Sequence, residues 1–384
     1  MQTESIHDYS RSAIENVLGQ RFSDGNSLKL LCHGTEAFDI IFRSLEAAKR
    51  FICLEFYIIR NDATGWALAE VLKRKAAEGV DVYMRYDHFG CLGTPSSFWK
   101  SLKDSGVRVR ASRPFKWSAP GHYLHRNHRK LIVIDGEVSF TGGLNIGDEY
   151  RKIIHRKSPW RDTGIFMKGP ISAQLYGIFK ESWSQWGGEP ILYSATPVRI
   201  KNGSSAIPIF TNSAKQRRRF RKLLYHSINS AKKSIHMTTA YFTPSKRLIK
   251  TLEDAVQRGV DVNLLLPGRS DSIVPFYAGR YFFSRLLKAG LKIHTYENEI
   301  LHAKTSVFDS IWSIIGSSNL DFRSMRRNDE GNVGVLGRKF GSQMIGMFKN
   351  DLEHSRRINP AQWSGRPMHE KLQERFFVLF RRRL

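Results

Sequence analysis

Apolar positions along the chain alternate between a helix-like and a strand-like spacing, and the same alternation occurs twice. Residues 45–57 (LEAAKRFICLEFY) and 228–241 (INSAKKSIHMTTAY) each indicate the end of a helix followed by an apolar strand. Residues 76–87 and 255–267 each place a Gly between a helix and a β-branched strand, as helix C-termini favour. The segments 101–110 and 285–294 repeat this order. The chain therefore contains one internal repeat.

Alternation of helices with buried strands predicts an α/β fold. We expect two α/β domains with central mixed sheets flanked by helices, related by a pseudo-two-fold axis and sharing one active site. Residues 195–206 concentrate Gly, Pro, Ser and Asn between the repeats and predict a linker. The expected parts are an N-terminal domain over 1–200, a C-terminal domain over 201–367 and an amphipathic, basic helix over 368–384.

Composition narrows the class of partner. The 384 residues include 61 Lys and Arg against 35 Asp and Glu, a formal net charge of +26. This favours an anionic partner, and nucleic acid and an anionic lipid surface both fit. The cysteines (Cys32, Cys53 and Cys91) have no C-x-x-C spacing, which argues against a disulfide framework or zinc site and for a reducing compartment. No run of 18 apolar residues occurs, so we expect peripheral membrane contact without a transmembrane helix.

The strongest match between the halves is a set of polar residues at identical spacing. In each half His-x-Lys is followed after four residues by Asp, and six residues later by a segment that begins with Gly and ends with Asn. These residues are His128, Lys130, Asp135 and Asn145 in the first half and His302, Lys304, Asp309 and Asn319 in the second. Residues two apart on a strand point to the same face, so each His and its Lys can enter one site.

This set suits the cleavage of a phosphodiester. The reaction needs a nucleophile for phosphorus, a proton for the departing alkoxide, and donors around the non-bridging oxygens. A neutral imidazole can attack while a protonated one donates, because the ordinary pKa of His is about 6.5. Zinc sites combine His with Cys or carboxylate ligands rather than with neighbouring ammonium groups. We therefore expect chemistry that needs no metal and no cofactor.

At these residues the sequence resembles the phospholipase D superfamily, whose HxKxxxxD motif occurs twice here. Further segments resemble bacterial cardiolipin synthases of the short type without N-terminal transmembrane helices: GGLNIGDEY at 142–150, PWRDTGIFMKGP at 159–170, AYFTP at 240–244 and GSSNLDFRS at 316–324. The resemblance implies a duplicated phospholipase D-like fold and a phosphohistidine intermediate. It implies that His128 is the nucleophile and His302 the general acid and base.

The resemblance also implies roles for the other motif residues. Both lysines and both asparagines would stabilise the five-coordinate transition state. Asp162 and Glu330, which follow His128 and His302 by 34 and 28 residues, would orient the histidines. The motif aspartates, Asp135 and Asp309, would brace the backbone between strand and turn. Between Arg323 and Glu330 the family usually has apolar residues, and Met325, Arg326 and Arg327 are expected to alter the acceptor pocket.

The function implied is transfer of a phosphatidyl group between phosphatidylglycerol molecules to give cardiolipin and glycerol. The alternatives are phospholipase D-type hydrolysis, another phosphatidyl transfer and, less favoured, a phosphodiesterase nuclease. Two basic and aromatic segments favour a lipid surface over nucleic acid: the loop at 113–128, and a C-terminal helix with Leu372, Phe376, Leu379 and Phe380 on one face, flanked by Lys371, Arg375 and Arg381 to Arg383. We expect peripheral association with the cytoplasmic side of the cell membrane, and the oligomeric state stays open.

Overall fold

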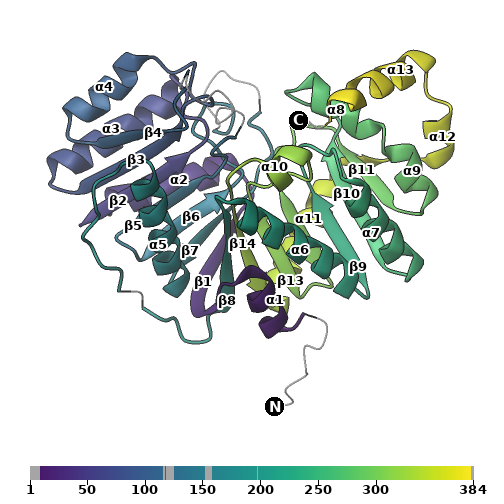
Figure 1. Cartoon of the computed structure of the whole chain (residues 1–384), viewed down its shortest axis with the longest axis horizontal. Helices are drawn as coiled ribbons and strands as arrows, with labels where there is room; N and C mark the ends of the chain where they lie inside the picture. The colour runs from purple at the N-terminus through teal and green to yellow at the C-terminus, as the bar shows by residue number, and fades with distance from the viewer. Residues whose placement is uncertain (1–8, 116, 118–124, 152–157, 197, 382–384) are drawn as a thin grey trace.

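The computed structural model describes residues 9–115, 117, 125–151, 158–196 and 198–381 (Figure 1). After helix α1 (Arg11–Leu18), the first half contains β1 (Ser23–Leu31), α2 (Gly34–Glu46), β2 (Phe51–Phe56), α3 (Ala63–Ala77), β3 (Asp81–Asp87), α4 (Ser96–Asp104), β4 (Arg108–Ser112), β5 (Leu131–Ile134), β6 (Val138–Gly142), β7 (Gly164–Lys168) and α5 (Pro170–Gln185).

The second half repeats this order of elements. It contains β8 (Ser204–Thr211), α6 (Ala214–Ser230), β9 (Ser234–Thr238), α7 (Lys246–Gln257), β10 (Asp261–Pro267), α8 (Ile273–Arg280), α9 (Phe283–Lys288), β11 (Lys292–Tyr296), β12 (Thr305–Phe308), β13 (Trp312–Gly316), α10 (Phe322–Arg326), β14 (Glu330–Leu336), α11 (Arg338–Glu353) and β15 (Ser355–Arg357). The chain continues through α12 (Pro360–Ser364), α13 (Met368–Phe377) and the 3₁₀ turn η2 (Val378–Phe380).

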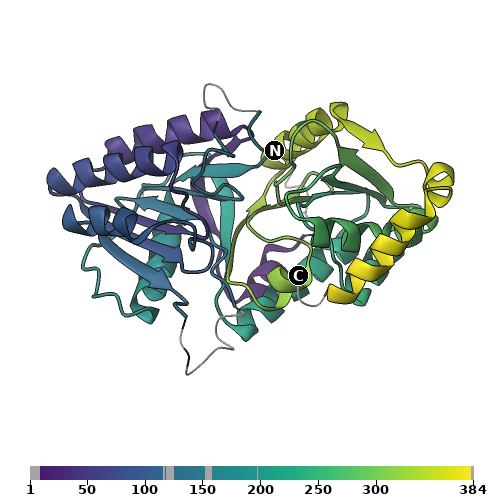
Figure 2. The ribbon, with the colours of Figure 1, turned by 90° about the horizontal axis from the view of Figure 1, so that it is seen from above.

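The described strands form one mixed sheet, ordered β15-β11-β10-β9-β12-β13-β14-β8-β1-β7-β6-β5-β2-β3-β4. Apart from β15, the order on one side of the β8–β1 junction mirrors the order on the other. In each half three strands run parallel and the hairpin strands pair antiparallel. The mixed α/β architecture with helices on the sheet confirms the predicted fold class. Figure 2 shows the halves side by side, with their connecting loops meeting between them.

The halves share a central core. Apolar residues of α5 and the first half-sheet pack in one cluster with residues of α11 and the second half-sheet, including Trp183, Phe210, Val333 and Met344. Two further clusters lie beneath the outer helices, one in each half. Because both halves contribute to the central cluster, their relative position is fixed by buried apolar surface.

The first described residues depart from the order that the repeat suggests. The boundary expected near residue 200 would place these residues in the first half. In the structure, however, Tyr9, Ile14 and Leu18 pack with Phe220 and Leu224 in the core of the second half. Helix α1 lies against α6 (Figure 1). The N-terminal segment therefore crosses the junction before β1 enters the first half.

None of the described helices is long and apolar enough to cross a membrane. The C-terminal helix expected over 368–384 corresponds to α13 and η2, which pack on α8, and residues 382–384 lie outside the described residues. Phe377 stacks on Tyr277, and the buried carboxylate of Glu374 pairs with Arg280 and Arg366. These contacts leave the opposite face of the helix exposed.

Candidate active site

The two His-x-Lys motifs lie where the halves meet, and each is held by backbone from the other half. The His128 amide donates to the Asp329 carbonyl at 2.8 Å, and the Asp329 amide donates to the Arg126 carbonyl at 2.8 Å. In the same way the His302 amide donates to the Arg161 carbonyl at 2.7 Å. The motif of one half and the carboxylate segment of the other thus form a short parallel bridge, twice.

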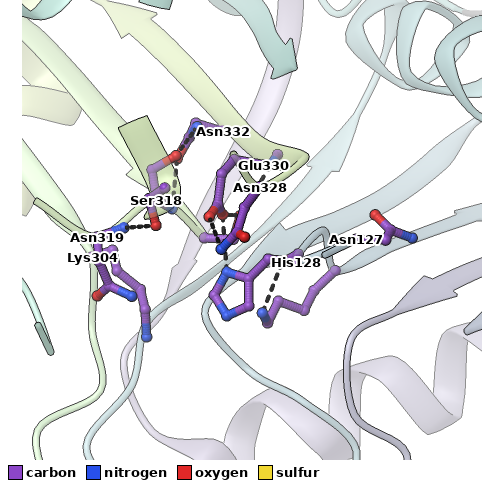
Figure 3. A network of polar contacts seen from close by, with 12 residues as sticks. Asn127, His128, Lys304, Ser318, Asn319, Asn328, Glu330 and Asn332 are labelled. Carbon is purple, nitrogen blue, oxygen red and sulfur yellow. Dashed lines mark hydrogen bonds and ion pairs between the residues drawn. The ribbon is translucent and has the colours of Figure 1, made fainter. Parts of the chain in front are cut away.

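Each catalytic candidate histidine is paired with a carboxylate of the opposite half. His128 Nδ1 lies 2.9 Å from Glu330 Oε2, and His302 Nδ1 lies 2.6 Å from Asp162 Oδ2. Figure 3 shows the His128 ring turned toward Glu330, which enters from the second half. The sequence placed each carboxylate after the histidine of its own half, so the crossed pairing is visible only in three dimensions.

The carboxylates are buried and stay charged. Burial raises the pKa of Asp162, but the charges of Lys304 and His302 outweigh it, so the pKa lies below its ordinary value. The pKa of Glu330 is also lowered, because His128 and Lys130 outweigh the effect of burial. Ser317 Oγ donates a further hydrogen bond to Glu330. Both histidines therefore face an anionic acceptor.

Burial acts in the opposite direction on the cations of the site. It lowers the pKa of His128 to about 4, although the negative charge of Glu330 partly raises that pKa. Burial lowers the pKa of His302 as well. Burial also lowers the pKa of Lys130 to about 7 and that of Lys304 to about 8. A cleft that destabilises positive charge in this way gains most from an anionic ligand.

The lysines hold their own motifs in place. Lys130 Nζ donates to the His128 carbonyl at 2.8 Å and lies 5.4 Å from the centre of the Tyr57 ring. Lys304 Nζ bonds the His302 carbonyl and lies 2.7 Å from His302 Nδ1. Nδ1 of His302 therefore has two neighbours, an acceptor and a donor. His128 Nδ1 is bonded to Glu330 alone among the described residues.

The asparagines reach the same cleft from the turns that follow the hairpins. Asn145 Oδ1 accepts from the Ile58 amide at 3.3 Å, and Asn319 Oδ1 accepts from the Tyr241 amide at 3.3 Å. Asn145 Nδ2 donates to Tyr150 Oη at 2.8 Å. With their oxygens held by backbone amides, both asparagines line the cleft, where a side-chain amide can donate a hydrogen bond to a ligand.

Two glycines allow the close approach of Asp162. A Cβ added to Gly143 would lie 2.1 Å from Asp162 Oδ1, and one added to Gly142 would lie 2.5 Å from the Thr163 carbonyl. The second half has Ser317 in place of Gly143 and a longer carboxylate, Glu330. The Gly142-Gly143 sequence of the first half is thus explained by its close packing against Asp162, the carboxylate that pairs with His302, and against the adjacent Thr163.

The motif aspartates lie in the hairpin turns and do not line the cleft. Asp135 accepts from the backbone amides of Lys49, Arg50 and Phe51 at 2.8 to 2.9 Å. Asp309 accepts from three amides of residues 232–234 at 2.8 to 2.9 Å. Each carboxylate thus ties a turn to the start of a neighbouring strand. Their backbone φ angles of 54° and 53° fit tight turns between paired strands.

Sequence reasoning missed several residues of the cleft, whose volume is about 440 Å³. Tyr57 packs edge-on to His128 with ring centres 4.9 Å apart. Tyr150 and Trp160 each lie 5.6 Å from the His302 ring, and Tyr241 lies at 6.4 Å. Tyr57 and Tyr241 end the matched segments 45–57 and 228–241, which was a usable signal.

Other expected contributors fall outside the cleft. Met325 and Arg326, expected to alter the acceptor pocket, line a separate cavity beside α10. In the loop expected at 113–128, residues 116 and 118–124 lie outside the described residues, while Trp117 is 89% exposed. No cluster of three or more His, Cys, Asp or Glu side chains suited to a metal ion occurs in the described part of the chain.

Comparisons with known proteins agree with this geometry. The family model described as "Cardiolipin synthase, PLD-like domain" matches residues 41–181 and 224–352. A cardiolipin synthase of Alkalihalophilus pseudofirmus is 36% identical over 92% of this chain and 71% of its own length. Cardiolipin synthase A of Pseudomonas putida is 37% identical over 88% of this chain and 71% of its own length.

A solved structure shares the fold at low sequence identity. Phosphatidylserine synthase of Haemophilus influenzae superposes with a TM-score of 0.74 at 13% identity, covering 98% of this chain and 100% of that one. The two chains share one fold over almost their whole length. With matched motifs in both halves and one cleft between them, the chain belongs to the cardiolipin synthase family of phospholipase D-like proteins.

Proposed function

We propose that the protein is a phosphatidyltransferase that joins two phosphatidylglycerol molecules, giving cardiolipin and free glycerol. The observation that carries the proposal is the pair of buried histidines, each bonded to a carboxylate of the opposite half and facing one cleft. The relatives are named cardiolipin synthases, which supports cardiolipin as the product.

His128 is the proposed nucleophile. Its Nδ1 faces Glu330, an acceptor, so Nδ1 carries the proton and Nε2 keeps its lone pair. Burial holds the pKa of His128 at about 4, which keeps the ring neutral at physiological pH. A neutral imidazole with a fixed tautomer is suited to attack on phosphorus.

His302 is the proposed general acid and base. Asp162, with its lowered pKa, is a fixed anion 2.6 Å from Nδ1, and it stabilises the imidazolium form. A phosphodiester in the cleft adds a second negative charge and offsets the two effects that lower the pKa of His302, burial and the nearby charge of Lys304. The Nε2 proton of His302 can then pass to the leaving glycerol oxygen.

The two steps balance in atoms and charge. His128 Nε2 bonds to phosphorus as the bond from phosphorus to the glycerol headgroup oxygen breaks, and His302 gives its proton to that oxygen. The hydroxyl of a second phosphatidylglycerol then gives its proton to His302 and attacks phosphorus. The phosphorus–nitrogen bond breaks, and His128 is restored. Lys130, Lys304 and the asparagine amides are placed to stabilise charge on the non-bridging oxygens in both steps.

Aromatic rings around His302 favour a lipid alcohol over water as acceptor. Tyr150, Trp160 and Tyr241 surround the proposed general base and reduce its access to water. Water in place of the lipid hydroxyl would give phosphatidic acid, the product of the hydrolase alternative. The ratio of cardiolipin to phosphatidic acid therefore separates the two functions.

The test uses purified protein and liposomes containing labelled phosphatidylglycerol. We expect cardiolipin and glycerol as products, and a loss of at least about a hundredfold in rate for His128→Ala and for His302→Ala. His354→Ala, an exposed residue at the end of α11, is the matched control and should keep wild-type activity. Phosphate trapped on His302 but not on His128 would contradict the assigned roles. Cleavage of single-stranded DNA without any lipid product would refute lipid transfer itself.

We also propose that the protein docks on the membrane through its catalytic face. Leu372, Phe376 and Leu379 on the free side of the C-terminal helix are 57%, 56% and 74% exposed. Trp117 and Ile273, in segments that follow parallel strands of the two halves, are exposed as well. Exposed apolar side chains of this kind are typical of an interaction surface, and the basic residues beside those of α13 suit anionic lipid.

Substitution tests this surface better than removal of the helix, because the helix covers Arg280 and Tyr277 of α8. The double variant Leu372→Ser with Phe376→Ser should reduce co-sedimentation with phosphatidylglycerol vesicles at unchanged melting temperature. Leu192→Ser, at an exposed apolar residue between α5 and β8, is the control and should sediment like wild type. Equal sedimentation of all three proteins would exclude docking through α13. The three free cysteines agree with placement on the cytoplasmic side.

A further inference from the structure

A second cavity lies beside the catalytic cleft and has no part in the proposed transfer. It measures about 170 Å³ and lies between α6, the segment before α7, and α10, with Arg381 closing one side. Asp321 lines both this cavity and the catalytic cleft.

The walls of the cavity are rich in positive charge. Arg221, Lys246, Arg326 and Arg381 line it, and within the described residues no carboxylate forms an ion pair with any of them. Arg221 donates to the Met325 carbonyl, and its pKa is lowered by burial and then by the nearby Arg326. Asp321 is the one carboxylate among the described residues that line the cavity, so its walls carry a net positive charge, which favours an anionic ligand.

Two further observations point to a ligand with both polar and apolar parts. Thr243 Oγ1 is buried in the wall and has no hydrogen-bond partner among the described residues. The floor is apolar and consists of Leu224, Leu248, Leu320 and Met325, all buried. The volume is below the roughly 300 Å³ at which sites for whole drug-sized ligands begin, so it suits a headgroup and not a complete lipid.

We infer that this cavity binds the glycerophosphate headgroup of an anionic phospholipid that is not consumed. The inference rests on the membrane docking proposed above, because the chains of such a lipid would lie along the exposed apolar face of α13, next to Arg381. The four cations neutralise the phosphate, and Thr243 supplies a hydroxyl donor. The bound lipid holds the C-terminal helix on the bilayer at the edge of the catalytic cleft.

The test compares two double variants with the same change in charge. Lys246→Glu with Arg326→Glu alters the cavity at two exposed positions, and a Glu at the first residue of α7 suits the helix dipole. Lys339→Glu with Lys349→Glu makes the same change on exposed positions of α11, away from the cavity. Both are made in the His128→Ala background, so binding is measured without turnover and stands apart from the proposed reaction.

Binding is measured with vesicles of phosphatidylcholine containing one part in five phosphatidylglycerol, and thermal melting checks the fold of each variant. We expect the cavity variant to bind at least tenfold more weakly than its parent and the α11 variant less than threefold more weakly. An equal loss of vesicle affinity in the cavity variant and the α11 variant would mean that only the overall charge matters, and it would overturn the inference. The inference is also overturned if the cavity variant binds vesicles normally and selectively loses affinity for soluble sn-glycerol 3-phosphate or for single-stranded DNA.

Discussion

The lowered pKa values of the two lysines predict how ligand binding depends on pH. Burial lowers the pKa of Lys130 from 10.5 to about 7 and that of Lys304 to about 8. At a pH below these pKa values, the lysines carry a positive charge and can pair with a phosphodiester. Above them the empty cleft loses its positive charge, and a phosphodiester must bind together with a proton.

The size of the effect follows from the protonated fraction of Lys130. With a pKa of about 7, roughly half of the free protein carries the proton at pH 7 and about 1% at pH 9. If only the protonated form binds, affinity falls about 50-fold over this range, or about 2.3 kcal/mol. Loss of the proton from Lys304, with its pKa of about 8, adds up to about tenfold. His128, with a pKa of about 4, stays neutral over this whole pH range in the protein without ligand.

The assay is calorimetric titration with sn-glycero-3-phosphoglycerol, a soluble phosphodiester with the headgroup of the proposed substrate. Titrations between pH 7 and 9 in buffers of different ionisation enthalpy give both the affinity and the number of protons taken up. Lys130→Met should bind weakly at every pH and lose most of the pH dependence. Wild-type affinity that is constant from pH 7 to 9 would refute the reasoning, as would a Lys130→Met variant with an unchanged slope.

Three other substitutions test the supporting structure. Gly143→Ala places a methyl group against the Asp162 carboxylate and should reduce turnover at least about a hundredfold, whereas Gly177→Ala in α5, where a Cβ meets no neighbour, should be active. Asp135→Ala removes the acceptor of three backbone amides and should lower the free energy of unfolding by about 2 to 4 kcal/mol, measured by urea denaturation. Glu330→Gln should abolish phosphohistidine formation on His128, measured by mass spectrometry, and a normal yield would contradict the crossed pairing.

The repeated pattern in the sequence was sufficient to predict the fold class and the meeting of two motifs in one cleft. Identical spacing carries this information, although the expected place of the motifs on a strand was wrong: His128 and Lys130 lie just before β5, and His302 and Lys304 just before β12. The asparagines were also found in this way, since each follows its motif through one hairpin.

Other features depend on contacts between distant segments and could not be read from spacing. The carboxylate partners are exchanged between halves because β1 and β8 pair antiparallel at the centre and bring Asp162 and Glu330 across the junction. Helix α1 lies on the second half because its apolar residues meet α6, which no local pattern indicates. The aromatic residues of the cleft lie outside the motif, and only Tyr57 and Tyr241 left a signal in the sequence, as the matched ends of two repeated segments.

The crossed pairing of histidines and carboxylates also limits which mutations and which exchanges of one half the protein can tolerate. Neither repeat carries a complete histidine–carboxylate pair of its own, so a mutation in one repeat is compensated only by a change in the other. A chimaera that exchanges a whole half with a relative joins His128 of one parent to the Glu330 equivalent of the other. Each repeat therefore depends on the other for a complete pair, and recombination at their boundary separates residues that must work together.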